Sequence, residues 1–206
     1  FGIESKINTK IIGCTFSTIT ISTIYSTGKG AFMIVSNKED SSTGFQLTDN
    51  IMSNISSTDL ISNGMYHAFY VINKGPSTIE YNSMELMAKG GSYSCLLQSF
   101  TTTSISNSNF TNCYCKIGSG LNVECFDDSL TNIRYSLLSK LGGLELLRFS
   151  YSPQSDGSRA TDNKQIAKVY IDHVSFYDNE GAFLITFNNY LYGSSSGSEA
   201  LNSNFE

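Results

Sequence analysis

The chain has 206 residues, of which 40% are hydrophobic and only 15% charged, and its formal net charge is −5. This length fits one domain with its own core, and an acidic chain without a basic run disfavours a nucleic-acid partner. No apolar stretch approaches the roughly 18 residues of a membrane-spanning helix, so we expect no membrane span. With 17 glycines and only 2 prolines, the composition favours strands and turns in a hydrogen-bonded stack.

One short pattern recurs along the chain: an aliphatic residue followed five positions later by another large apolar residue. In chain order the copies are Ile11 and Phe16, Leu47 and Met52, Ile79 and Met84, Ile105 and Phe110, Ile133 and Leu138, and Ile171 and Phe176, with a partial seventh copy at Ala200 and Phe205. Their first residues lie 26 to 38 positions apart. Such a period lies within the range of roughly 20 to 50 residues that is typical of solenoid repeats.

Each full copy is followed by a second signal, a glycine that leads into an alternating apolar strand. These strands are expected at 30–35, 64–72, 90–97, 120–125, 142–147 and 181–187. The same two signals in the same order indicate one structural unit that repeats. A single unit is too small to bury its own apolar side, so we expect stacked units to share one core.

Positions five apart have opposite side-chain parity on a strand, so both residues of a pair face inward only if the chain turns a corner between them. The corner positions are Cys14, Asn50, Asn82, Ser108, Ser136 and Val174. Asn and Ser suit a bend, Asn tolerates the left-handed conformation there, and stacked polar side chains can form a ladder. The sequence therefore predicts an all-β, single-domain parallel β-helix of about six coils over residues 1–206, or a segment of a longer solenoid.

Three polar stretches lengthen the repeating unit, at 36–44, 150–165 and 188–199. Each follows a glycine-led strand, so we expect them to protrude as loops along one side of the solenoid. That side is a candidate binding or decorated surface. The alternative is that these loops are tolerated insertions.

Five cysteines are present, an odd number, so at least one is unpaired or pairs outside the chain. Cys113, Cys115 and Cys125 cluster in the sequence, and Cys95 is expected one repeat away. These four residues are candidates for one or two disulfides in a secreted protein. The alternative is that all are small buried core residues. Cys14 stands alone and is expected to be a core thiol.

Short motifs accompany the paired signals: Asn109-Phe-Thr-Asn112, Phe176-Tyr-Asp-Asn179, Gly30-Ala31, Gly142-Gly143 and Gly181-Ala182. They resemble the repeats of polymorphic outer-membrane proteins and, more widely, of pectate-lyase-like right-handed β-helix surface proteins. The resemblance extends over nearly the whole chain. It implies a right-handed coil and an extracellular or cell-surface protein used for adhesion, coating or assembly.

Proteins of this fold also include polysaccharide lyases and hydrolases, which use paired carboxylates, or calcium ligands with a basic residue. Asp127-Asp128 is the only adjacent Asp pair, and its turn-like context indicates a solvated loop. His67 and His173 fall in predicted strands and are interpreted as structural residues. We therefore expect no catalytic residue, no metal site and no cofactor, in a protein that is not an enzyme.

Two N-glycosylation sequons begin at Asn54 and Asn109. Asn109 immediately precedes the inward-facing Phe110, so its side chain should point outward. This orientation is compatible with a covalent glycan on a secreted protein.

The sequence starts with a glycine-led strand pattern at 1–4 and ends with a first-strand pattern at 200–205, and neither shows a polar cap. Open strand edges can pair with another copy, and a contact that does not close generates a filament. The predicted function is a non-enzymatic structural protein of an extracellular filament or cell-surface layer that self-associates head to tail. The alternatives are a carbohydrate-binding or polysaccharide-degrading β-helix protein and a surface adhesin.

Overall fold

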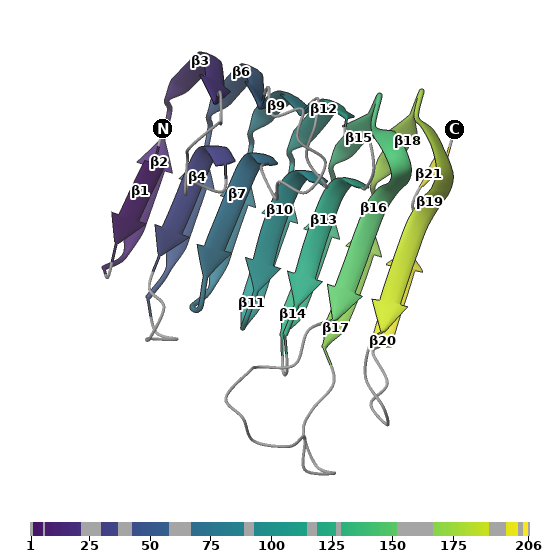
Figure 1. Cartoon of the computed structure of the whole chain (residues 1–206). Coiled ribbons are helices and arrows are strands. Elements are labelled where there is room, and N and C mark those ends of the chain that lie inside the picture. Colours follow the sequence, from purple (N-terminus) through teal and green to yellow (C-terminus); the bar gives the residue numbers. More distant parts are fainter. Residues whose placement is uncertain are drawn as a thin grey trace.

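The computed structural model describes residues 2–5, 7–21, 30–36, 43–57, 67–88, 93–114, 119–126, 129–151, 167–189, 197–201 and 204–205. These residues form parallel strands and contain no helix. The strands belong to a 14-stranded sheet and a 7-stranded sheet. In Figure 1 neighbouring strands belong to successive repeats of the chain, and the rows run from the purple N-terminal strands to the yellow C-terminal strands. The predicted all-β class with stacked parallel strands is therefore confirmed.

The chain passes through three strand series in a fixed order, and the strands pair within their own series except at one contact between the second and third series. The first series is the 7-stranded sheet, with β2 (Thr9–Ile12), β5 (Phe45–Thr48), β8 (Ser77–Glu80), β11 (Thr102–Ser106), β14 (Leu130–Arg134), β17 (Lys168–Asp172) and β20 (Gly197–Leu201). The second series is β3 (Thr15–Ile21), β6 (Ile51–Ser57), β9 (Ser83–Ala88), β12 (Asn109–Tyr114), β15 (Leu137–Ser139), β18 (Ser175–Tyr177) and β21 (Asn204–Phe205).

The third series contains the glycine-led strands. It is β1 (Gly2–Ser5), β4 (Gly30–Ser36), β7 (His67–Asn73), β10 (Tyr93–Ser99), β13 (Ser119–Cys125), β16 (Gly142–Tyr151) and β19 (Glu180–Asn189). It joins the second series where Tyr114 of β12 pairs with Gly142 of β16, so the two series together make the 14-stranded sheet.

The register confirms the recurring pairs residue by residue. Ile11, Leu47, Ile79, Ile105, Ile133, Ile171 and Ala200 pair in succession along the first series. Phe16, Met52, Met84, Phe110, Leu138, Phe176 and Phe205 do the same along the second series. The members of each pair lie on different strands, which confirms the predicted corner between them.

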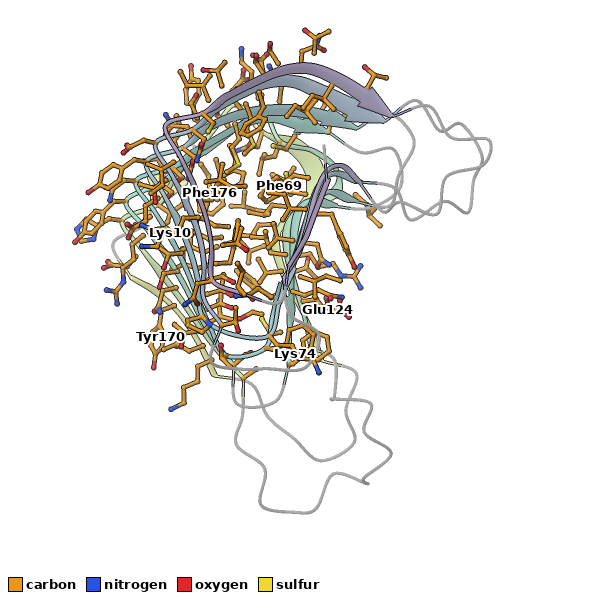
Figure 2. The ribbon with its side chains drawn as sticks, turned by 90° about the vertical axis from the view of Figure 1, so that its left-hand side faces the viewer. Lys10, Phe69, Lys74, Glu124, Tyr170 and Phe176 are labelled. Carbon is orange, nitrogen blue, oxygen red and sulfur yellow. The ribbon has the colours of Figure 1, made fainter. Side chains whose placement is uncertain are left out.

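All three series contribute to one shared core. The third series adds two buried columns of paired residues. One column contains Phe69, Cys95 and Leu121, and the other contains Val71, Leu97 and Val123. Phe69 and Phe176 point into the same interior from different strands (Figure 2). Because a repeat has only a few inward residues, each apolar side chain is buried by the repeats on either side of it.

The bend between the first and second series differs from the predicted one in a single detail. The left-handed conformation falls one residue before the predicted corner, at Gly13, Asp49, Tyr81, Asn107, Tyr135 and His173, with φ between 48° and 64°. Asn50 and Asn82 are instead buried, at 1% and 2% exposure. Their amides turn inward, where they bind backbone groups of the bend.

The predicted polar ladder is present at this buried position. The backbone N–H of Cys14 donates to Asn50 Oδ1 at 2.9 Å, and that of Asn50 to Asn82 Oδ1 at 3.0 Å. The ladder continues from Asn82 N to Ser108 Oγ and from Ser108 N to Ser136 Oγ, at 3.2 and 3.3 Å. Each side chain thus accepts a hydrogen bond from a backbone N–H of the preceding repeat. A buried N–H without such a partner would destabilise the fold.

A glycine at the start of a third-series strand supplies room rather than a bend. At Gly120, a Cβ atom would lie 2.7 Å from the Cys113 carbonyl oxygen and 3.2 Å from that of Leu146. These atoms belong to backbone and cannot turn aside as a flexible side chain would. Glycine therefore permits β13 to approach its neighbours closely.

The three predicted loops all connect a third-series strand to the next first-series strand. Residues 37–42, 152–166 and 190–196 lie outside the described residues. The described strands β16, β19 and β20 extend into the predicted loops at 150–165 and 188–199. The protrusion of these three stretches along one side of the stack stays a prediction.

We predict that Asn82→Ala destabilises the protein by about 2–3 kcal/mol, because it leaves the Asn50 N–H and the Leu47 carbonyl without their partner. Asn82→Ser is the matched control, since Ser108 and Ser136 fill the same position with a hydroxyl acceptor. We expect it to lose less than half as much. Urea unfolding of both variants measures the difference in the free energy of unfolding. Equal losses of stability would mean that the side-chain acceptor at position 82 is unimportant.

Candidate functional surfaces

The structure describes four of the five cysteines, Cys14, Cys95, Cys113 and Cys125, and shows no disulfide among them. Cys95 on β10 and Cys113 on β12 are fully buried, and their sulfur atoms face each other at 3.9 Å. Cys125 is also buried, with its sulfur 3.6 Å from Thr131 Oγ1. Cys14 is half-buried and donates to the Ile12 carbonyl.

This placement fits the interpretation of Cys95, Cys113 and Cys125 as small core residues, and it brings the candidate disulfide pair Cys95 and Cys113 together. Cys14, expected as a core thiol, is only half-buried. Cys115 lies outside the described residues, so a disulfide through it stays a prediction. Cys95 and Cys113 come from strands of different series, and a bridge between them would link the third series to the second across the core.

We predict that an added small-molecule disulfide such as oxidised glutathione links Cys95 to Cys113 by two exchange steps, releasing two glutathione thiols. Thiols titrated in the denatured protein should then fall from five to three. Cys95→Ala should keep all four of its remaining thiols under the same treatment, and Cys125→Ala should still lose two. Loss of two thiols in Cys95→Ala would contradict the assignment of the bridge to Cys95 and Cys113.

Both predicted glycosylation sites are exposed. Asn109 begins β12 between Ser83 and Leu137 of the neighbouring strands, and Phe110 beside it is buried. Asn54 has a φ of 52° at an irregular point of the register between β6 and β9. Both side chains are therefore placed as a glycan requires, and glycosylation itself stays a prediction.

The histidine interpretation is wrong for one of the two residues. His173 lies at the bend between β17 and β18, with a φ of 51° and half of its side chain exposed, and not within a strand. Its Nδ1 is 2.6 Å from Asp172 Oδ1, and its ring lies 5.0 Å from that of Tyr135. His67 begins β7 as expected. Asp127 and Asp128 lie outside the described residues.

The third series also carries a polar cluster that was not predicted from the sequence. Its residues alternate along the strands with those that face the core. Tyr70, Leu96, Asn122 and Arg148 pair in succession, and Gln98, Glu124 and Ser150 form the adjacent column. Glu124 lies on the opposite side of the stack from Lys10 and Tyr170 of the first series (Figure 2).

Hydrogen bonds tie this cluster together across the strands. Gln98 Nε2 donates to Glu124 Oε2 at 2.6 Å, and Ser150 Oγ donates to Asn122 Oδ1 at 3.3 Å. Tyr70 and Asn122 are buried, at 1% and 2% exposure, although their neighbours Phe69 and Val123 are the residues that face the core. Polar groups withdrawn from water in this way interact more strongly with one another.

Burial, and to a lesser degree the negative charge of Glu124, raises the pKa of Tyr70 from its ordinary value of 10.0 to about 12. The phenol is therefore neutral at physiological pH and acts as a hydrogen-bonding group rather than as a base. Burial also raises the pKa of the Cys125 thiol, from 9.0 to about 11, so this cysteine stays a thiol rather than a nucleophilic thiolate.

The raised pKa of Tyr70 predicts a loss of stability at high pH. The unfolded chain releases the phenol proton more readily than the folded chain does. The contribution of Tyr70 to the free energy of unfolding is therefore complete below pH 10 and is lost as pH rises through about 12. Urea unfolding at a series of pH values should show a shallower decline for Tyr70→Phe than for the unaltered chain over this interval. Tyr177→Phe, at an exposed position, should not change the decline, and equal slopes for all three proteins would contradict the assignment.

Within the described ranges, no group of three His, Cys, Asp or Glu side chains is placed to hold a metal ion. The same residues include no helix that is long and apolar enough to span a membrane. The chain matches no protein-family model, and no curated protein or solved structure matches it.

Proposed function

We propose that the chain is a right-handed parallel β-helix and serves as a non-enzymatic structural protein of an extracellular filament or cell-surface layer. The fixed order of the three series, each strand pairing parallel to the next of its kind, supports the β-helix. Parallel crossover connections are right-handed in nearly all proteins, which supports the hand. The exposed Asn54 and Asn109 sequons favour an extracellular setting.

The observation that carries the proposal is the set of strand edges at the two ends of the stack. Among the described strands, β2 pairs only with β5 and β20 pairs only with β17. All pairing is parallel, so β20 of one copy can add to β2 of another with the same chain direction. Such a contact joins unlike surfaces and leaves new open edges, so it propagates instead of closing.

The side chains near the N-terminal edge also favour stacking. Phe16 and Ile19 of β3 are only partly buried and pack against the core, whereas Met52 and Ile55, their partners in the next repeat, are buried. A copy stacked on this edge would cover the end of the core. A second copy placed on this edge would continue the first-series column, because Ala200 at its other end would meet Ile11.

The direction of the backbone groups on β2 allows a precise test. The N–H groups of Thr9 and of Gly13, which follows β2, donate to the carbonyls of Gly44 and Thr48 on the β5 side, at 3.0 Å each. Alternate residues of a strand direct these groups to opposite sides, so the N–H of Lys10 points to the open edge. Proline at position 10 would remove that donor without breaking the β2–β5 hydrogen bonds.

We predict that the unaltered chain forms filaments visible by negative-stain electron microscopy and that Lys10→Pro shifts it to monomers in sedimentation velocity. Lys10→Ala removes the same exposed side chain but keeps the N–H, so it should still assemble. Circular dichroism of Lys10→Pro should remain that of the unaltered chain. Monodisperse monomers of the unaltered chain across a concentration series would contradict the proposal.

A further inference from the structure

The left-handed residues at the bend form a continuous column along the stack. We call Asp49, Tyr81, Asn107, Tyr135 and His173 the bend column, since they occupy the same position in five successive repeats. The N–H of each of the first four donates to the carbonyl that precedes the next: Asp49 to Glu80, Tyr81 to Ser106, Asn107 to Arg134 and Tyr135 to Asp172. These bonds fix the residues one above another.

Two of these residues are ill-suited to the conformation they adopt. Asp and Asn are enriched at positive φ, whereas a bulky residue there is an outlier. Tyr81 and Tyr135 have φ values of 54° and 48°, and 57% of each residue is exposed. Burial therefore offsets little of the strain, and strain at an exposed position motivates a functional hypothesis.

The groups around these rings have the chemistry of a sugar-binding surface. The Tyr135 ring lies 5.0 Å from the His173 ring, tilted by 33°, which makes an aromatic surface across two repeats. Asn107 supplies an amide beside Tyr81 and Tyr135, and the carboxylate of Asp172 lies 2.6 Å from the His173 ring nitrogen. Aromatic rings pack against the C–H faces of pyranoses, while amides and carboxylates bind their hydroxyl groups.

The spacing and charge narrow the class of ligand. Neighbouring strands lie about 4.8 Å apart, close to the rise of one pyranose in an extended β-1,4-linked chain. A sugar chain along the stack would therefore meet one bend residue for each sugar unit. Asp49, Glu80 and Asp172 outnumber Arg134 along this edge, so acidic polymers, including nucleic acids, are disfavoured.

We propose that the bend column binds an extended, neutral β-linked polysaccharide that runs parallel to the stack. The inference does not depend on filament formation, because all five residues belong to one chain. It concerns a lateral surface, whereas the stacking contacts lie at the ends.

The test is isothermal titration of the purified chain with cellohexaose and chitohexaose, with polygalacturonate as the acidic comparison. The unaltered chain should bind at least one of the neutral oligosaccharides and bind polygalacturonate more weakly. The double variant Tyr81→Asn, Tyr135→Asn should weaken neutral-sugar binding at least tenfold. Tyr177→Asn removes a tyrosine of similar exposure, 56%, that does not have positive φ, and it should bind as the unaltered chain does.

Thermal unfolding of the same variants separates a binding role from a structural one. Asn favours the left-handed conformation, so the double variant should keep or raise its Tm. A lowered Tm would show that the rings stabilise the bend and would overturn the inference. It would also be overturned if neither neutral oligosaccharide binds the unaltered chain, or if polygalacturonate binds more tightly.

Discussion

The buried ladder at the bend between the first and second series is the constraint on which the rest of the structure depends. Asn50 and Asn82 each bind the repeat before them and their own bend at once: the Asn82 amide donates to the carbonyls of Leu47 and Glu80 while its oxygen accepts from Asn50 N. A shift of one residue at this corner would turn every inward side chain of the following strand outward. The ladder therefore fixes the register that keeps the apolar columns of both series in the core.

The core columns could be predicted from sequence because they depend on two simple regularities. Side chains alternate along a strand, and the unit recurs often enough to reveal corresponding positions, so Ile105 and Phe110 identify their equivalents in the other repeats. The bend itself could be placed only to within one residue. Preference for the left-handed conformation pointed to Asn82, but Tyr81 adopts it, because the amide of Asn82 is needed inside as a hydrogen-bonding group.

The polar cluster on the third series could not be found in the same way. Tyr70, Asn122 and Arg148 lie at the parity opposite to the core, where a repeating sequence places no hydrophobic constraint and residues differ from one repeat to the next. Only the register shows that they share a column. The contact between the Cys95 and Cys113 sulfur atoms could not be predicted either. It joins strands of two different series, and the sequence spacing does not determine which of their residues face each other.

The ends and the sides of the stack present different chemistry, so the proposed assembly and the proposed sugar binding would use different surfaces. At the ends, backbone N–H and C=O groups and apolar columns can be extended by any strand of matching direction, so pairing there depends little on the identity of exposed side chains. Along the bend, by contrast, the backbone N–H groups of Tyr81 and Tyr135 are already bound to neighbouring repeats, and their side chains are exposed. Substitutions in the bend column therefore alter a lateral surface without changing the edges. Stacking of copies would lengthen that surface in proportion to the number of repeats, so that weak contacts to a polymeric ligand would add along its length.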